Sequence, residues 1–149
     1  MSIQLPIITY GTLRPGCGNY LNLLEGRTIA EDTVYLTGYQ MRGRSGFPYV
    51  IVTGDDNDRV VGTLVHVAPE LYERTLSSMD SLEGYREGSN QNHYDRILVN
   101  YELNGEIGQA YMYVAGSGFA LDMANELPII PEGDWIEHVR QTRPMYAKY

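Results

Sequence analysis

Residues 94–114 read YDRILVNYELNGEIGQAYMYV, and this stretch carries the clearest structural signal in the sequence. Tyr94–Leu103 and residues 106–114 are both rich in β-branched and aromatic residues, which favour strands. Between them stands Asn104-Gly105, the preferred pair for a two-residue turn with positive φ at both positions. The stretch therefore predicts an antiparallel β-hairpin.

Outward from this hairpin, strands dominate. Short apolar runs bounded by turn residues predict further strands at residues 5–9, 34–41, 49–53 and 60–67. Helices are predicted at residues 19–24, 69–82 and 119–126, with a last one opened by Asp134. Pro69 suits the first turn of its helix, and Gly84 is placed to end that helix in a left-handed conformation. About six strands with few helices predict an α+β fold, a small mixed β-barrel, closed or nearly closed, flanked by short helices.

Composition limits the function. The chain has 149 residues, of which 43% are apolar and 20% charged, as expected for one globular domain spanning residues 1–149. Its net charge is -8 with the acidic residues spread along the chain, so it lacks the basic face that nucleic acid requires. Lys148 is the only lysine, which argues against Schiff-base chemistry and a lysine-based phosphate site.

The expected cellular location is the cytoplasm. Cys17 is the single cysteine and cannot form an internal disulfide, and the N-terminal residues lack the pattern of a signal peptide. No apolar run approaches the ~18 residues of a membrane span, so insertion into a membrane is not expected.

The segment after the first strand is the first candidate site. Gly11 and Gly16 have the spacing that opens a P-loop, but Cys17-Gly18 replaces the Lys-Ser/Thr pair that binds phosphate. What remains is a glycine loop whose backbone N–H groups can bind a carboxylate or another small anion. Alternatively, it is only a tight turn between a strand and a helix.

A carboxylate in an apolar stripe is the second candidate. Helical spacing places Leu71, Leu76, Met79 and Leu82 on one side of the helix at residues 69–82, with Asp80 at the margin. If the helix continues, Glu83 lies inside this stripe, where desolvation would raise its pKa toward that of a general acid/base. If the helix frays earlier, Glu83 is a solvated end charge.

Other chemistry is poorly supported. The three histidines share no ligand spacing, Ser45 lacks the frame of a nucleophile elbow, and we expect no metal and no cofactor. Thirteen tyrosines stand against two phenylalanines, which suggests that some tyrosines line a cavity because each buried hydroxyl needs a partner. The alternative is the ordinary preference of strands for aromatic residues.

Together these features resemble a known family. Tyr10-Gly11-Thr12-Leu13-Arg14 is similar to the Tyr-Gly-Ser/Thr-Leu loop of the gamma-glutamylcyclotransferase-like family, and its Thr-Leu form looks closer to the branch acting on gamma-glutamyl amines. The likeness covers nearly the whole chain. Further matching segments are Gly46-Phe47-Pro48, Val61-Gly62-Thr63-Leu64-Val65, Leu82-Glu83-Gly84-Tyr85, Tyr94-Asp95-Arg96, Ala110-Tyr111-Met112-Tyr113 and Gly133-Asp134-Trp135.

The resemblance implies an enzyme that releases 5-oxoproline from a small gamma-glutamyl substrate. By similarity, the backbone of Gly11, Thr12 and Leu13 would hold the glutamyl carboxylate, Tyr10 and Tyr113 would line the pocket, and Glu83 would be the acid/base group. The substrate supplies its own nucleophile, so no cofactor is needed, and a monomer or homodimer is expected. The family also includes proteins without established activity.

The alternative is a non-catalytic module that binds a small acidic metabolite or a protein terminus. Glu83 favours the enzyme, because a pocket built only to bind an anion gains nothing from a carboxylate. Cys17 and residues 87–93 depart from the expected pattern and bear on specificity.

Overall fold

A computed structural model describes residues 3–11, 13–14, 17–43 and 46–142. Its main feature is a five-stranded mixed sheet in the order β2-β5-β1-β7-β6, accompanied by a two-stranded sheet of β3 and β4. The strands are β1 (Ile7–Thr9), β2 (Thr28–Thr37), β3 (Tyr39–Arg42), β4 (Tyr49–Val52), β5 (Arg59–Val67), β6 (Tyr94–Leu103) and β7 (Glu106–Ala115). The helices are α1 (Gly18–Leu23), α2 (Tyr72–Glu83), α3 (Phe119–Asn125) and α4 (Trp135–Thr142), with the 3-10 turn η1 (Pro69–Leu71) before α2.

β1 is short but occupies the centre of the sheet. It pairs antiparallel with β5, where Ile7 faces Val65, and parallel with β7, where Ile7 faces Tyr111. Because neighbouring side chains of a strand point to opposite faces, Ile7 packs in the apolar cluster that contains Met79 of α2, and Ile8 packs in the cluster around Trp135 of α4. β1 therefore separates two cores, and the glycine loop begins where it ends.

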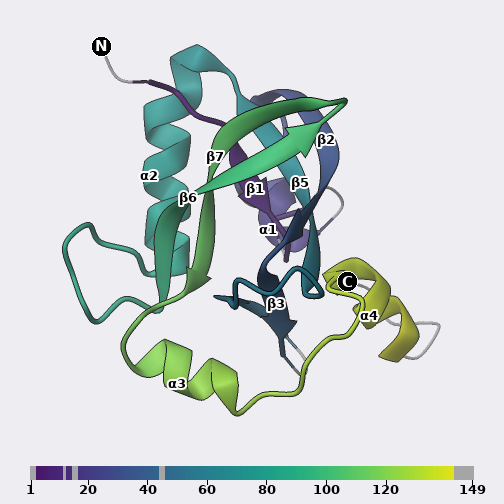
Figure 1. The fold of residues 1–149 in the computed structure, drawn as a ribbon. Coiled ribbons are helices and arrows are strands. Elements are labelled where there is room, and N and C mark those ends of the chain that lie inside the picture. The colour runs from purple at the N-terminus through teal and green to yellow at the C-terminus, as the bar shows by residue number, and fades with distance from the viewer. Residues whose placement is uncertain (1–2, 12, 15–16, 44–45, 143–149) are drawn as a thin grey trace.

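The predicted hairpin is confirmed. Leu103 pairs with Glu106, so Asn104 and Gly105 form a two-residue turn. Their φ angles of 54° and 82° are the positive values that such a turn requires. Figure 1 shows the hairpin of β6 and β7 curving across the molecule, with α2 on one side and α4 on the other.

The strand predicted at residues 34–41 is wrong in its bounds. β2 already begins at Thr28, and the backbone breaks at Gly38, whose φ of 87° separates β2 from β3. Residues 28–33 are mostly exposed, so they carry no alternation of buried and exposed residues from which a strand could be read.

α2 continues through Glu83, so the alternative in which the helix frays before this residue is wrong. Gly84 has a φ of 67° and its N–H donates to the carbonyls of Asp80 and Ser81, which ends the helix as predicted. The buried face is centred on Tyr72, Thr75 and Met79, whereas Leu82, expected in the apolar stripe, is 44% exposed. Glu83 follows Met79 by one turn and continues this buried face.

The α+β class is confirmed, but the described strands do not form a closed barrel. The sheet is strongly curved and its edge strands β2 and β6 come near each other, yet the hydrogen-bonded order ends at these two strands. β3 and β4 pair only with each other as strands and form the separate small sheet. In the part of the chain that is described, no helix combines the length and apolar character needed to cross a membrane.

Candidate active site

One cavity, of about 300 Å³, opens where β1 ends. Its walls come from the glycine loop, from the segment before β4, from the end of α2, and from β6 and β7. This volume is at the small end of the range for ligand pockets, so it suits a small substrate. The described residues that line it are Ile8, Thr9, Tyr10, Gly11, Leu13, Asn19, Gly46, Phe47, Pro48, Leu82, Glu83, His93, Tyr94 and Tyr113.

The cavity brings together the residues that the sequence singled out. Tyr10, Gly11 and Leu13 line it from the loop, and Glu83 and Tyr113 line it from α2 and β7. Thr12, the remaining candidate, lies outside the described residues. The glycine loop and the carboxylate at the end of α2 thus face one space, although they are far apart in the sequence.

The glycine loop is a tight turn held against Pro48. The Arg14 N–H donates to the Gly11 carbonyl at 3.1 Å. A Cβ atom on Gly11 would lie 3.0 Å from Cδ of Pro48, closer than side chains normally pack, so any larger residue must displace the loop or the proline. The loop is also anchored by Arg14, whose Nη1 lies 2.8 Å from Oδ1 of Asp134.

Glu83 is a partly buried carboxylate with no partner in the described part of the chain. No hydrogen bond or ion pair joins it to any described residue, although it lines the cavity. Burial raises the pKa of Glu83 to about 7 because the charged form is poorly solvated there. A carboxyl group with this pKa can accept a proton and return it at neutral pH.

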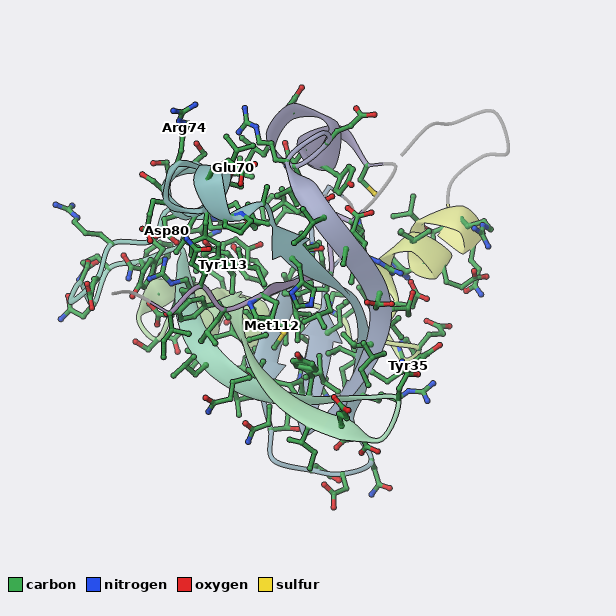
Figure 2. All side chains as sticks on the ribbon, turned by 90° about the horizontal axis from the view of Figure 1, so that it is seen from above. Tyr35, Glu70, Arg74, Asp80, Met112 and Tyr113 are labelled. Atoms are coloured by element: carbon green, nitrogen blue, oxygen red, sulfur yellow. The ribbon has the colours of Figure 1, made fainter. Side chains whose placement is uncertain are left out.

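Asp80, one turn earlier on α2, has the opposite environment. Its Oδ2 lies 2.5 Å from Nη1 of Arg96, and its Oδ1 accepts a hydrogen bond of 2.6 Å from the hydroxyl of Tyr113. The Arg96 guanidinium also lies over the rings of Tyr85 and Tyr111, at 5.0 and 4.7 Å from their centroids. Figure 2 shows Asp80 and Tyr113 side by side. Arg96 therefore connects the end of α2 to β6 and β7.

The tyrosines around the cavity are hydrogen-bonded and neutral. The Tyr10 hydroxyl donates to the Tyr113 carbonyl at 2.6 Å, and the Tyr94 hydroxyl donates to the Pro48 carbonyl at 2.8 Å. Burial raises the pKa of Tyr10 and of Tyr94, and the nearby charge of Glu83 adds to the effect on each. These hydroxyls keep their protons at neutral pH, which leaves Glu83 to accept one.

Sequence reasoning missed several residues of the site. Phe47 and Tyr94 line the cavity, and Asp80 and Arg96 lie beside it, but none of these four was a site candidate. His93, which also lines the cavity, is the last residue of the stretch 87–93 that was predicted to bear on specificity. Phe47 and Arg96 stand in segments that resemble the family, and Asp80 lies at the margin of the apolar stripe, so each carried a partial signal. Their contacts cross the chain and leave no local pattern. Within the described ranges, no group of three or more His, Cys, Asp or Glu residues could hold a metal ion.

Comparison with known protein families agrees with the resemblance noted in the sequence. Residues 7–137 match the family model described as "Gamma-glutamyl cyclotransferase, AIG2-like". No curated protein sequence matches the chain.

Several solved structures share the fold. The crystal structure of YkqA from Bacillus subtilis is 20% identical with a TM-score of 0.68, and the match covers 94% of this chain but only 42% of that protein. An AIG2-like protein from Mus musculus is 18% identical with a TM-score of 0.57, and 97% of this chain and 94% of that one are covered. An uncharacterized protein from Pyrococcus horikoshii is 21% identical with a TM-score of 0.54, covering 93% and 99%.

Proposed function

Because this chain belongs to the gamma-glutamyl cyclotransferase, AIG2-like family, we propose that it releases 5-oxoproline from a small gamma-glutamyl compound, with Glu83 as the acid/base group. The observation that carries this proposal is the environment of Glu83. It is partly buried, it has no partner among the described residues, its pKa is about 7, and it shares a cavity with the glycine loop.

The proposed reaction needs only one such group. The α-amine of the gamma-glutamyl part attacks its own γ-carbonyl carbon, forming the C–N bond of a five-membered lactam. The C–N bond to the leaving amine breaks. Glu83 takes one proton from the α-ammonium, which frees the nitrogen lone pair for attack, and delivers that proton to the departing nitrogen. The attacking nitrogen becomes positively charged as the new C–N bond forms, and it gives up a second proton, which passes to the released amine. The products are 5-oxoproline and a free amine.

The other walls of the cavity would hold the folded conformer of the substrate. In the proposed complex, backbone N–H groups of Gly11, Thr12 and Leu13 bind the α-carboxylate, and the rings of Tyr10 and Tyr113 confine the carbon chain. Holding amine and carbonyl in contact contributes to the rate, because the free substrate must otherwise lose the conformational freedom of its carbon chain before it cyclises. The close approach of Pro48 to Gly11 supports a fixed position of this loop.

The test is turnover of a gamma-glutamyl panel by the purified full chain, with 5-oxoproline measured directly. The panel should vary only the leaving amine or amino acid. Release of 5-oxoproline from any member, and its loss in Glu83→Gln, would establish the activity. Binding of panel members without release of 5-oxoproline would instead support the non-catalytic module.

A further inference from the structure

Three aromatic rings, Phe47, His93 and Phe119, contact one another beside the cavity, and we call them the aromatic rim. Phe47 meets His93 edge-on with centroids 5.8 Å apart, and His93 is parallel to Phe119 at 6.4 Å. Phe47 and His93 line the cavity. The two phenylalanines are the only ones in the chain, and each is 48% exposed, whereas tyrosines fill the interior. A cluster of exposed apolar rings beside a cavity is typical of a binding surface.

The rim is uncharged and held in place. His93 is hydrogen-bonded through Nε2 to the Tyr49 hydroxyl, and the Tyr49 ring stacks on that of Tyr94 at 5.1 Å. Burial lowers the pKa of His93, so its ring is neutral at pH 7.

The loop before His93 is fixed by the buried amide of Asn92. Its Oδ1 accepts from the Arg86 N–H at 3.0 Å, and its Nδ2 donates to the Arg86 carbonyl at 3.0 Å and to Asp95 at 3.0 Å. A loop held by its own hydrogen bonds presents the rim in one arrangement, which reduces the entropy lost when a ligand binds.

The charges of the cavity restrict what can lie against the rim. Among the described residues that line it, Glu83 is the one carboxylate, and none is an arginine or lysine. In the proposed complex, backbone N–H groups of the glycine loop bind the α-carboxylate of the gamma-glutamyl part. A second carboxylate, on an amino-acid leaving group, would be desolvated near Glu83 without a described cation.

We propose that the aromatic rim binds the leaving group. The preferred leaving group is an arylalkyl amine that has no charged group other than the amine formed on release. This inference rests on the proposed function and assigns its substrate class. The aryl ring would pack on Phe47 and His93, where ring contacts of this kind contribute roughly 3- to 10-fold in affinity each.

The experiment compares gamma-glutamyl-phenethylamide, gamma-glutamyl-ethylamide and gamma-glutamylglycine, which share the glutamyl part. We expect kcat/KM to be at least about tenfold higher for the phenethylamide than for either other compound. Phe47→Ala should reduce that preference by roughly 3- to 10-fold, mainly through KM. Tyr35→Ala is the matched control, because Tyr35 is 57% exposed, does not line the cavity, and lies at the opposite side of the view from Tyr113 in Figure 2.

The outcomes separate this inference from the proposed function. If 5-oxoproline is released but the glycine compound is used as well as the phenethylamide, the inference is overturned and the activity stands. If no compound reacts, calorimetry with the same three compounds measures their binding and tests the rim separately from the activity. Tighter binding of the phenethylamide that is lost in Phe47→Ala supports the rim and contradicts the enzyme, whereas equal binding of all three overturns the rim.

Discussion

Two carboxylates near the end of α2 differ in what surrounds them. Asp80 binds Arg96 and Tyr113, so its charge is neutralised by fixed partners. Glu83, one turn later, lines the cavity without a partner among the described residues. The same functional group therefore has a structural role at one position and is available for proton transfer at the next.

Replacing Glu83 tests that availability. Glu83→Gln keeps the size of the side chain but cannot carry the proton, so kcat should fall at least ~10²-fold while the protein still folds and binds substrate. In the wild type, the acid limb of kcat/KM should have an apparent pKa near the value of about 7 set by burial. Glu73→Gln, an exposed glutamate of the same helix, is the control. A Glu83→Gln protein that retains more than about a tenth of wild-type kcat would contradict the mechanism.

The raised pKa of Glu83 also makes stability depend on pH. Its pKa is about 7 in the folded chain against 4.5 for the free group, so between these values the folded state binds more protons than the unfolded state. The free energy of unfolding should therefore fall as pH rises from about 4.5 to about 7, by up to roughly 3 kcal/mol. Glu83→Gln removes this penalty.

Urea unfolding at several pH values provides the measurement. Glu83→Gln should be more stable than the wild type at pH 8, and the difference should disappear as pH falls below about 4.5. Glu73→Gln should follow the wild type throughout. A difference between Glu83→Gln and wild type that is constant with pH would show that Glu83 is solvated.

At the scale of elements, the direction of α2 decides where Glu83 lies. Arg96 of β6 contacts Asp80 before the helix ends and Tyr85 just after it. It also lies over Tyr111 of β7. The last turn of α2 is thus fixed against the sheet by a residue that does not line the cavity, which makes Arg96 a positioning residue.

Arg96→Ala should loosen this attachment. We expect kcat to fall roughly 10- to 100-fold with a smaller change in KM, because a displacement of about 1 Å at a reacting group has effects of this size. Water should reach Glu83 more easily, so the apparent pKa of the acid limb should move below about 7. Arg96→Lys should restore activity only in part, since lysine cannot reproduce the planar contacts with the rings.

The matched control for Arg96→Ala is Arg74→Ala. Arg74 lies on the exposed face of α2 and projects into solvent (Figure 2). The substitution Arg74→Ala should leave kcat, KM and the pH profile unchanged. If the acid limb of the pH profile does not shift in Arg96→Ala, then Arg96 contributes to stability but does not position Glu83.

Elements with local signals could be predicted from the sequence. Asn104-Gly105 fixed the hairpin, and Gly84 fixed the end of α2, because each requires a positive φ that few residues adopt. The first half of β2 could not be predicted, since its residues are exposed at a sheet edge. The family was identified correctly, whereas the branch acting on gamma-glutamyl amines stays a prediction.

The residues of the site also divide into those that have a local signal in the sequence and those that do not. Glu83 and the glycine loop could be proposed from a helical stripe and a glycine pattern together with the family resemblance. The contacts of Arg96 with Asp80 and of Phe47 with His93 join separate elements, and no spacing in the sequence records them. Of the predicted closed or nearly closed barrel, full closure was wrong, because pairing between β2 and β6 depends on how far the whole sheet curls.

At the scale of the whole molecule, the glycine loop is tied to the C-terminal helix. The side chain of Arg14 is only 10% exposed and pairs with Asp134 at 2.8 Å. Asp134 also accepts the Glu137 N–H at 3.3 Å, and so caps α4. One aspartate therefore connects a wall of the cavity to the far end of the described chain.

Substitutions of Asp134 separate its two roles. Asp134→Asn keeps the cap but leaves the Arg14 charge uncompensated, and should lower the free energy of unfolding by about 2 kcal/mol. Asp134→Ala also removes the cap and should cost about 1 kcal/mol more. Both should raise KM because the loop loses its anchor. Asp122→Asn, an exposed aspartate of α3, is the control for urea unfolding and kinetics. A stability of Asp134→Asn within ~0.5 kcal/mol of the wild type would contradict this role.

The central position of β1 has a consequence for the chain during its synthesis. The ribosome makes β1 before both of its hydrogen-bonded neighbours, β5 and β7, and the later of these, β7, ends only at Ala115. A nascent chain that stops before the hairpin has β1 at an open edge, and Tyr113 is missing from the cavity. The complete cavity therefore forms only after β7 has left the exit tunnel, and translation products truncated before β7 have the glycine loop but lack one wall of the cavity.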